Sequence, residues 1–209
     1  MGIKHTVISK DDCNGKKKHG KEERIVEVIK TRVKDLLLIK SDVRPDNRGY
    51  FFESWNRRDF EAAGIEVDFC QDNISVSSGK WTLRGLHYQA GEYSQAKLVR
   101  CLQGELLDVA VDLRRDSETF GKWASVRLVG GDGQAFFVPR GFAHGFLTLS
   151  DDVIFSYKVD NFYNRPSERN ILYSDPAIGI DWGLPDGVKP LLKPADEQAP
   201  LLNDAKDLF

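Results

Sequence analysis

The chain has 209 residues, of which 41% are hydrophobic and 11% aromatic, enough to form a hydrophobic core in one domain. Its 30 Lys and Arg and 32 Asp and Glu give a formal net charge of -2. That balance leaves no overall positive field for a nucleic acid or an anionic membrane, so any anion must be bound locally. No apolar run approaches the roughly 20 residues of a membrane helix, and residues 1–24 contain no apolar secretion segment, so we expect a soluble, cytoplasmic protein.

Residues 1–24 are predicted to be a charged N-terminal extension, because they contain many Lys, Asp, Glu and Gly residues and few apolar ones. The cluster at residues 16–19 could bind a nucleic acid. Two glutamates, Glu22 and Glu23, follow almost directly, and we therefore favour a solvated tail. Residues 25–209 show no fixed-period repeat and no linker, which indicates a single domain.

Short apolar or alternating runs, separated by Gly, Asp, Asn and Pro, recur from residue 25 onward and predict an all-β sandwich or barrel. The expected strands lie within residues 25–29, 36–40, 49–55, 97–104, 105–113, 124–129, 134–139, 145–150 and 153–159. Residues 57–64 predict a short helix ended by Gly64, and the GGDG segment at 130–133 predicts a hairpin turn. Residues after Trp182 predict a C-terminal arm of turns with at most a short helix. Because a β-sandwich exposes strand edges, we expect a homodimer.

The three cysteines, Cys13, Cys70 and Cys101, cannot all pair within one chain and lack the short spacings of thiolate metal sites. We therefore expect reduced thiols, two of them buried in strands.

His87 and His144 are the candidate acid or base residues, since the other two histidines lie in the N-terminal extension. A lone histidine in a β core is more often structural, so each one needs reactive neighbours. For His87 these are Arg84 and Lys97. In a regular strand, residues 83, 85, 87 and 89 share one face and Arg84 lies on the other, whereas a bulge at Gly85 would bring Arg84 to the face of His87.

The segment GQAFFVPRGFAHGF, Gly133–Phe146, resembles the second histidine-bearing motif of the cupin superfamily. Metal-binding cupins carry two further histidines, one residue apart, in their first motif. Here that motif reads HYQ, so Gln89 stands at the second position. Two histidines are too few for a stable divalent site, and we expect no metal. Histidine, lysine and tyrosine side chains can instead carry out metal-free acid/base chemistry.

Several long strings resemble the dTDP-4-dehydrorhamnose 3,5-epimerase family: DNRGYFFESW, FCQDNISVS, LRGLHYQ, QAKLVRCLQGELLDVAVDLRRDSETFGKW, VPRGFAHGF, YKVDNFYNRPSE and DPAIGIDW. The resemblance is nearly collinear over residues 33–202. It implies a cupin-type jelly roll that forms a homodimer. It also implies conversion of dTDP-4-dehydro-6-deoxy-D-glucose to dTDP-4-dehydro-L-rhamnose without a cofactor.

The resemblance implies four catalytic residues. The hydrogens on C3 and C5 flank the C4 ketone, so removing either one gives an enolate, and reprotonation from the other face inverts the centre. On this resemblance His87 is the base, oriented by Asp196. Tyr157 is the acid on the opposite face of the sugar, and Lys97 is the cation beside the enolate oxygen. We also expect a neighbouring cation, Lys158 or Lys97, to lower the pKa of Tyr157.

The resemblance also implies how a dTDP-sugar is held. Arg48, Arg84 and Lys193 offer positive charge to the diphosphate. Tyr163 is expected to stack on thymine, with Phe162 as the alternative. In this family the DNRGYFFE strand reaches across the dimer, so the partner completes each site. The expected binding residues are Arg48, Glu53, Gln71, Asn73, Arg84, His144, Tyr163, Glu168 and Lys193.

The chain departs from the family pattern at three places. Phe162 replaces the usual Tyr, Gly183 replaces the Pro that usually follows the Trp, and KPADE replaces a Ser-x-Lys-Asp tail, which bears on Asp196. Two alternative functions stay open. One is an epimerase acting at C3 only or C5 only, and the other is a non-catalytic cupin that binds sugar nucleotides.

Overall fold

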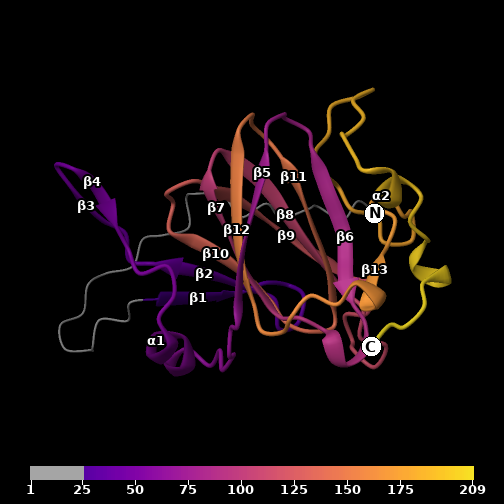
Figure 1. Ribbon diagram of the computed structural model, residues 1–209, viewed down its shortest axis with the longest axis horizontal. Helices are drawn as coiled ribbons and strands as arrows, with labels where there is room; N and C mark the ends of the chain where they lie inside the picture. Colours follow the sequence, from indigo (N-terminus) through magenta and orange to yellow (C-terminus); the bar gives the residue numbers. More distant parts are fainter. Residues whose placement is uncertain (1–25) are drawn as a thin grey trace.

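Two antiparallel sheets form the body of the molecule, and a two-stranded hairpin projects from it (Figure 1). The computed structural model describes residues 26–209, so the predicted N-terminal extension lies outside the described residues. The strands of the six-stranded sheet are, in order across the sheet, β1 (Val26–Lys30), β2 (Leu37–Ser41), β10 (Gln134–Val138), β7 (Lys97–Gln103), β12 (Val153–Val159) and β5 (Gln71–Ser77). Those of the five-stranded sheet are β13 (Glu168–Asn170), β6 (Leu83–Gln89), β11 (Phe142–Thr148), β8 (Glu105–Asp112) and β9 (Trp123–Val129). This arrangement is the all-β jelly roll that the sequence predicts.

The core has three layers: one lies between the sheets, and one lies on the outer face of each sheet, which the C-terminal arm and helix α1 cover in part. Phe136 and Val126 belong to the cluster between the sheets. Leu86 and Trp182 belong to a second cluster, where the C-terminal arm covers the five-stranded sheet. Phe60 lies in a third cluster, where helix α1 (Arg57–Ala62) covers the six-stranded sheet. Central strands are therefore buried on both faces, and β11 is buried at every position.

Helix α1 forms where the sequence predicts it. Asn56 caps it by accepting a hydrogen bond from the backbone N–H of Arg58. The chain leaves the helix through Gly64, whose φ of +83° favours glycine. The buried side chain is Phe60, and its burial contributes roughly 2–3 kcal/mol to docking the helix on the sheet.

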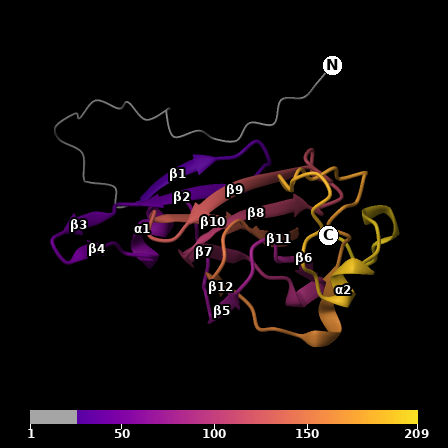
Figure 2. The ribbon, with the colours of Figure 1, turned by 90° about the horizontal axis from the view of Figure 1, so that it is seen from above.

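The projecting hairpin consists of β3 (Arg44–Asp46) and β4 (Gly49–Phe51) (Figures 1 and 2). The expected strand at 49–55 is thus shorter than predicted. Tyr50 and Phe51 on the hairpin are 56% and 65% exposed. The base of the hairpin is held by Arg100, which donates to the backbone carbonyl of Ser54 and lies 5.7 Å from the centre of the Phe52 ring. The hairpin is therefore anchored at its base while its tip exposes two aromatic rings.

The C-terminal arm covers the outside of the five-stranded sheet (Figure 2). It carries helix α2 (Pro194–Glu197) and a 3-10 turn at Leu202–Asp204. Leu191 forms a parallel bridge with Thr82 at the start of β6. Near the chain end, the Phe209 ring lies 5.9 Å from the Tyr88 ring of β6. The arm thus holds α2 beside β6, and its turns and short helix agree with the prediction for the residues after Trp182.

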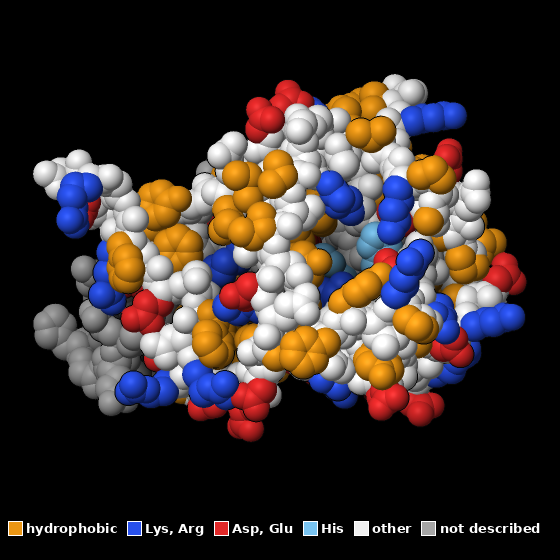
Figure 3. Space-filling model, in the orientation of Figure 1, with side chains coloured by type: hydrophobic (Ala, Val, Ile, Leu, Met, Phe, Trp, Pro, Cys, Tyr) orange, Lys and Arg blue, Asp and Glu red, His pale blue; other side chains and the backbone are white. Residues whose placement is uncertain are grey.

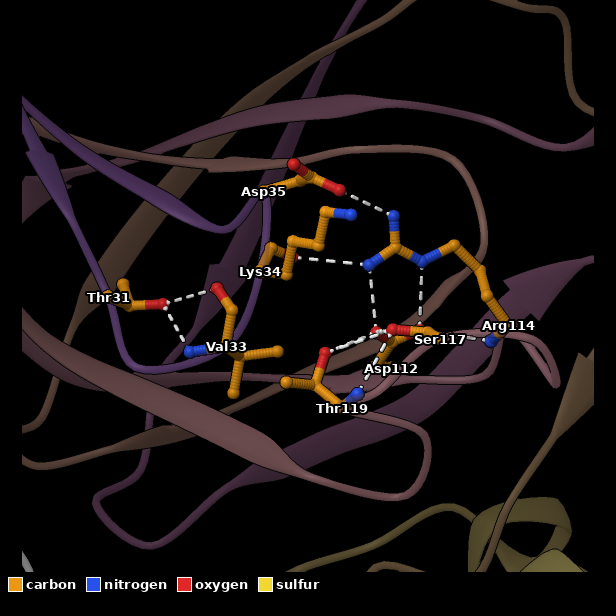
Figure 4. A network of polar contacts seen from close by, with 8 residues as sticks. All are labelled: Thr31, Val33, Lys34, Asp35, Asp112, Arg114, Ser117 and Thr119. Carbon is orange, nitrogen blue, oxygen red and sulfur yellow. Dashed lines mark hydrogen bonds and ion pairs between the residues drawn. The ribbon is translucent and has the colours of Figure 1, made fainter.

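A polar network ties the loop between β1 and β2 to the end of β8 (Figure 4). The buried Asp112 carboxylate accepts hydrogen bonds from Arg114, Ser117 and Thr119, at 2.6–2.9 Å for the side-chain donors. Arg114 also donates to Asp35 at 2.7 Å in that loop. Burial raises the pKa of Asp112, but these hydrogen bonds outweigh burial and hold it below its usual range.

Two local predictions are wrong. The GGDG turn at 130–133 forms, but it leads from β9 of one sheet to β10 of the other and closes no hairpin. Cys101 is buried in β7, whereas Cys70 is exposed just before β5. Both cysteines are free thiols. None of the helices formed by residues 26–209 is long and apolar enough to cross a membrane.

Candidate active site

A cavity of about 440 Å³ opens between the two sheets and the C-terminal arm. Figure 3 shows the hollow, with histidine side chains inside it and Lys and Arg side chains around it. Both sheets and the arm contribute to the wall, which combines charged, aromatic and aliphatic groups. The lining residues are Ser75, Thr82, Leu83, Arg84, His87, Lys97, His144, Phe146, Phe155, Tyr157, Glu168, Leu191, Leu192, Lys193 and Asp196.

His87 of β6 and Asp196 of α2 form a hydrogen-bonded pair, with 2.7 Å between Nε2 and Oδ1. The carboxylate only accepts hydrogen bonds when ionised, so Nε2 carries the proton and Nδ1 is left as the basic nitrogen. Burial raises the pKa of Asp196, but its hydrogen bond to His87 and the nearby Lys193 outweigh burial and hold it below the usual range. The pair is an imidazole oriented by a carboxylate, an arrangement suited to a general base.

A bulge in β6 explains why Arg84 shares the cavity with His87. His144 of β11 pairs with His87, whereas Phe146 pairs with Arg84, so three steps along β6 match two along β11. At the bulge, Gly85 has a φ of +133°, and a Cβ there would lie 2.5 Å from Gly145 Cα. Glycine is therefore required, and the possible bulge considered from the sequence is present.

Arg84 is held at the cavity mouth by β5. Its guanidinium donates to the backbone carbonyl of Val76 at 3.0 Å and to Ser77 Oγ at 3.2 Å. These two contacts fix the guanidinium beside the cavity. A fixed guanidinium is suited to binding phosphate oxygens.

Lys97, Asp108 and His144 form a charged cluster in the wall. His144 Nε2 lies 2.9 and 3.1 Å from the two carboxylate oxygens of Asp108, and both side chains are buried. Burial lowers the pKa of Lys97 to about 8, against the attraction of Asp108 and Glu168. Burial also lowers the pKa of His144 and raises that of Asp108, with their mutual attraction opposing both shifts. The cluster places one poorly solvated ammonium at the cavity.

Tyr157 of β12 enters the cavity from the six-stranded sheet, whereas His87 comes from the five-stranded sheet. Its ring continues an aromatic row, 5.6 Å from Phe155, which stacks on Phe146 at 4.3 Å. The prediction that a lysine lowers the pKa of Tyr157 is wrong. Burial raises that pKa, with Arg84 as the opposing cation, and Lys158 is paired with Asp72 at 2.8 Å. The phenol therefore stays protonated at neutral pH, as an acid requires.

Gln89 is hydrogen-bonded to backbone groups through both the nitrogen and the oxygen of its amide. Its amide nitrogen donates to the carbonyls of Tyr93 and Phe162 at 2.8 and 3.1 Å, and its oxygen accepts from the Asn164 N–H at 2.6 Å. The side chain therefore holds the loop after β12 against β6. In residues 26–209, no three His, Cys, Asp or Glu side chains gather as a metal site.

Lys193 supplies a positive charge to the cavity despite the unusual KPADE tail. It precedes α2, and its Nζ lies 3.5 Å from Asp196 Oδ1 and 3.9 Å from Glu168 Oε1. Glu168 also accepts a hydrogen bond from the Tyr163 hydroxyl at 2.7 Å. The departure from the family pattern in KPADE bears on the assignment of Asp196, and the structure places Asp196 in hydrogen-bond contact with His87.

The remaining predicted binding residues lie outside the cavity of the single chain. Arg48 is paired with Asp46 on the hairpin, and Glu53 accepts a hydrogen bond from Asn56 near its base. Gln71 and Asn73 are hydrogen-bonded to each other on β5, in line with the cavity residue Ser75. Phe162 and Tyr163 are exposed on the loop after β12.

Sequence reasoning missed Asp108 and the apolar wall. The carboxylate of Asp108 is fully buried within the run ELLDVAVDL, and a charge in the middle of an otherwise apolar strand was the available signal. Phe146, Phe155 and Leu83 carry no comparable signal, because aromatic and aliphatic residues are common at the buried positions of most strands.

The fold and the cavity together define a jelly-roll protein whose cavity holds an oriented histidine from one sheet and a tyrosine from the other, a set of groups suited to proton transfer. The sequence profile of the dTDP-4-dehydrorhamnose 3,5-epimerase family matches residues 30–204. The chain therefore belongs to this family, and it is an isomerase.

Individual relatives agree with this assignment. The chain is 50% identical over 179 residues to the dTDP-4-dehydrorhamnose 3,5-epimerase of Salmonella typhimurium, covering 85% of this chain and 96% of that protein. It is 45% identical to a dTDP-6-deoxy-D-glucose-3,5-epimerase of Legionella pneumophila solved with dTDP-4-keto-L-rhamnose, at a TM-score of 0.82 over 88% of this chain and 97% of that one. A 3'-monoepimerase of Streptomyces bikiniensis, solved with dTDP-quinovose, is 32% identical at a TM-score of 0.76, covering 83% and 86%.

Proposed function

We propose that the chain inverts C3 and C5 of dTDP-4-dehydro-6-deoxy-D-glucose to give dTDP-4-dehydro-L-rhamnose, through enolates and without a cofactor. One observation carries this proposal: His87 and Tyr157 project from different sheets into the same cavity. A single group that removes and returns a proton on one face cannot invert a stereocentre. Two groups on different walls can.

Each inversion uses the cavity residues in order. His87, oriented by Asp196, removes the hydrogen from the carbon beside the C4 ketone. Lys97 stabilises the negative charge that develops on the ketone oxygen, which is worth roughly 3 kcal/mol for a donor in a dry site. Tyr157 then protonates the carbon from the other face, and exchange with solvent removes the proton from His87 and returns one to Tyr157 before the next inversion. The raised pKa of Tyr157 keeps its proton available for this step.

The nucleotide part of the substrate is assigned to the rim. Arg84 and Lys193 offer charge to the diphosphate, with His144 and Glu168 in the same cavity wall. Tyr163, or Phe162 beside it, offers an exposed ring for the thymine. Gln71 and Asn73 extend the polar surface along β5 beside Ser75.

A second copy of the chain completes the site in this proposal. The hairpin is anchored at its base, and its tip exposes the rings of Tyr50 and Phe51. Such rings are suited to packing against another subunit. Docking of the hairpin on the neighbouring β5 edge would bring Arg48 and Glu53 to a rim that lacks them in the single chain.

The test is incubation with dTDP-4-dehydro-6-deoxyglucose in deuterated water, followed by mass spectrometry and NMR of the sugar. Deuterium at both C3 and C5 is expected. Deuterium at one carbon would identify a monoepimerase, like the Streptomyces bikiniensis relative. No deuterium would indicate a binding protein. His87→Asn is the matched variant, which should bind dTDP and exchange neither position.

The absence of a metal requirement is tested separately. Exchange should persist after dialysis against EDTA, because Gln89 is committed to the backbone of neighbouring loops. Loss of exchange that is restored by a divalent ion would overturn the metal-free mechanism.

A further inference from the structure

Asp196 has little support from its own secondary structure. It lies on α2, a helix of only four residues in the C-terminal arm, and it belongs to neither sheet. The orientation of its carboxylate therefore depends on the groups that donate to it. Besides His87, these are the Gly85 N–H at 3.4 Å from Oδ2, and Lys193 Nζ and Asn170 Nδ2 at 3.5 and 3.3 Å from Oδ1.

Asn170 differs from the other donors in where it is attached. It is the last residue of β13 and pairs in register with His87 on β6. Its amide nitrogen lies 3.3 Å from Asp196 Oδ1 and 3.4 Å from the carbonyl oxygen of Ala195. One short side chain thus links the strand beside the base to the helix that carries the carboxylate.

Lys193 is less suited to orienting the carboxylate. Its side chain is 48% exposed, and its ammonium also faces Glu168 at 3.9 Å. Lysine has a flexible stem and lies on the rim assigned to the diphosphate, so its position depends on bound ligand. The second acceptor of the neutral Asn170 amide, the Ala195 carbonyl, lies in the same helix as Asp196, so both contacts hold that helix in one place.

We propose that Asn170 is a positioning residue that fixes the Asp196 carboxylate toward His87 and so keeps the proton on Nε2 and the base on Nδ1. The proposal rests on the proposed function for its effect on turnover. Its structural content, the orientation of the Asp196–His87 pair, can be measured without substrate.

Gln198, which lies near Asn170, provides a matched control. Asn170 also lines a second cavity of about 390 Å³, together with Tyr88 and Gln198. Gln198 is exposed in that cavity, and its side chain has no hydrogen bond to Asp196. Gln198→Ala therefore removes an amide from the same cavity without touching the pair.

Two substitutions of Asn170 separate positioning from packing. Asn170→Ala should lower kcat for deuterium exchange about tenfold, the usual scale for one hydrogen bond to a charged group, with KM and dTDP affinity within about twofold. Asn170→Asp keeps the shape but adds a carboxylate beside Asp196. The added negative charge favours the protonated imidazole, so the acid limb of the kcat/KM profile should move to higher pH by about one unit.

The substrate-free readout is the nitrogen NMR spectrum of the His87 ring. In the wild type the ring should be the Nε2–H tautomer, and Asn170→Ala should give a mixture of tautomers, while Gln198→Ala stays unchanged. An unchanged tautomer in Asn170→Ala together with an unmoved pH profile in Asn170→Asp would overturn the proposal. If the wild type exchanges no deuterium, the proposed function fails, and the tautomer still decides the role of Asn170.

Discussion

Replacing Asp196 by Asn removes one negative charge and leaves the size of the side chain unchanged. The carboxylate accepts hydrogen bonds at both of its oxygens, whereas the amide accepts them at its single oxygen only. If its oxygen faces His87 Nε2, its NH2 group takes the place of Oδ2 and faces the Gly85 N–H, so two donors meet. If the amide turns over, the donor meets His87 instead. Both arrangements disturb the oriented imidazole.

The magnitude follows from the charge that develops on His87 when it takes a proton. Two unit charges about 4 Å apart attract by about 4 kcal/mol at an effective dielectric constant of about 20. The His87 side chain is 27% exposed, and solvent screening reduces this attraction. A loss of about 2–4 kcal/mol corresponds to a decrease of roughly 30- to 900-fold in kcat/KM.

The assay is the initial rate of deuterium incorporation at C3 and C5, with dTDP affinity measured in parallel. Affinity should change little, because the carboxylate acts on the base and has no contact with the diphosphate in the proposed mechanism. Asp204→Asn is the control, since Asp204 is an exposed acidic residue of the same arm. A rate for Asp196→Asn within threefold of the wild type would refute the assignment of Asp196 as the partner of the base.

Four further outcomes follow from the site and its supports. Because burial lowers the pKa of Lys97 to about 8, kcat/KM should fall as pH rises through about 8, and Lys97→Arg should move that limb upward; an unmoved limb would remove Lys97 from the mechanism. Tyr157→Phe should still exchange hydrogen on the His87 side while inversion nearly stops, and equal losses of both would mean that Tyr157 only positions the sugar. Gly85→Ala should lower the free energy of unfolding by more than about 2 kcal/mol, measured in urea, because a Cβ would lie 2.5 Å from Gly145 Cα at a φ of +133°. Asp112→Asn should lower the free energy of unfolding at neutral pH. Because the folded pKa of Asp112 is lowered, the loss of stability relative to the wild type should be complete above about pH 4 and should disappear as pH falls through the folded pKa. A loss of stability that persists in acid would contradict the role of the charge.

Sequence reasoning reached the all-β class because period-two alternation and turn residues are local properties. Most strands lie within one or two residues of their predicted positions, as β7 and β12 show. The sheet to which a strand belongs is set by contacts distant in sequence. The turn at 130–133 therefore gave no local sign that it crosses between sheets.

In the site, too, local sequence features were predictable, whereas contacts between residues distant in the sequence were not. The resemblance supplied His87, Tyr157, Lys97 and Asp196, and the structure places all four around one cavity. The direction in which the pKa of Tyr157 shifts could not be predicted from its neighbours in the sequence. Lys158 is adjacent in the chain, but successive residues of a strand point to opposite faces, and it pairs with Asp72 on β5 instead.

His87 and Asp196 are 109 residues apart in the sequence. In the folded protein their contact requires both β6 in its sheet and the C-terminal arm docked on the outside of that sheet. Contacts of such long sequence separation carry a large loop-closure cost and form slowly. On refolding from denaturant, β-sheet circular dichroism should therefore recover before catalytic turnover, and the delay between the two signals measures how long the arm takes to dock.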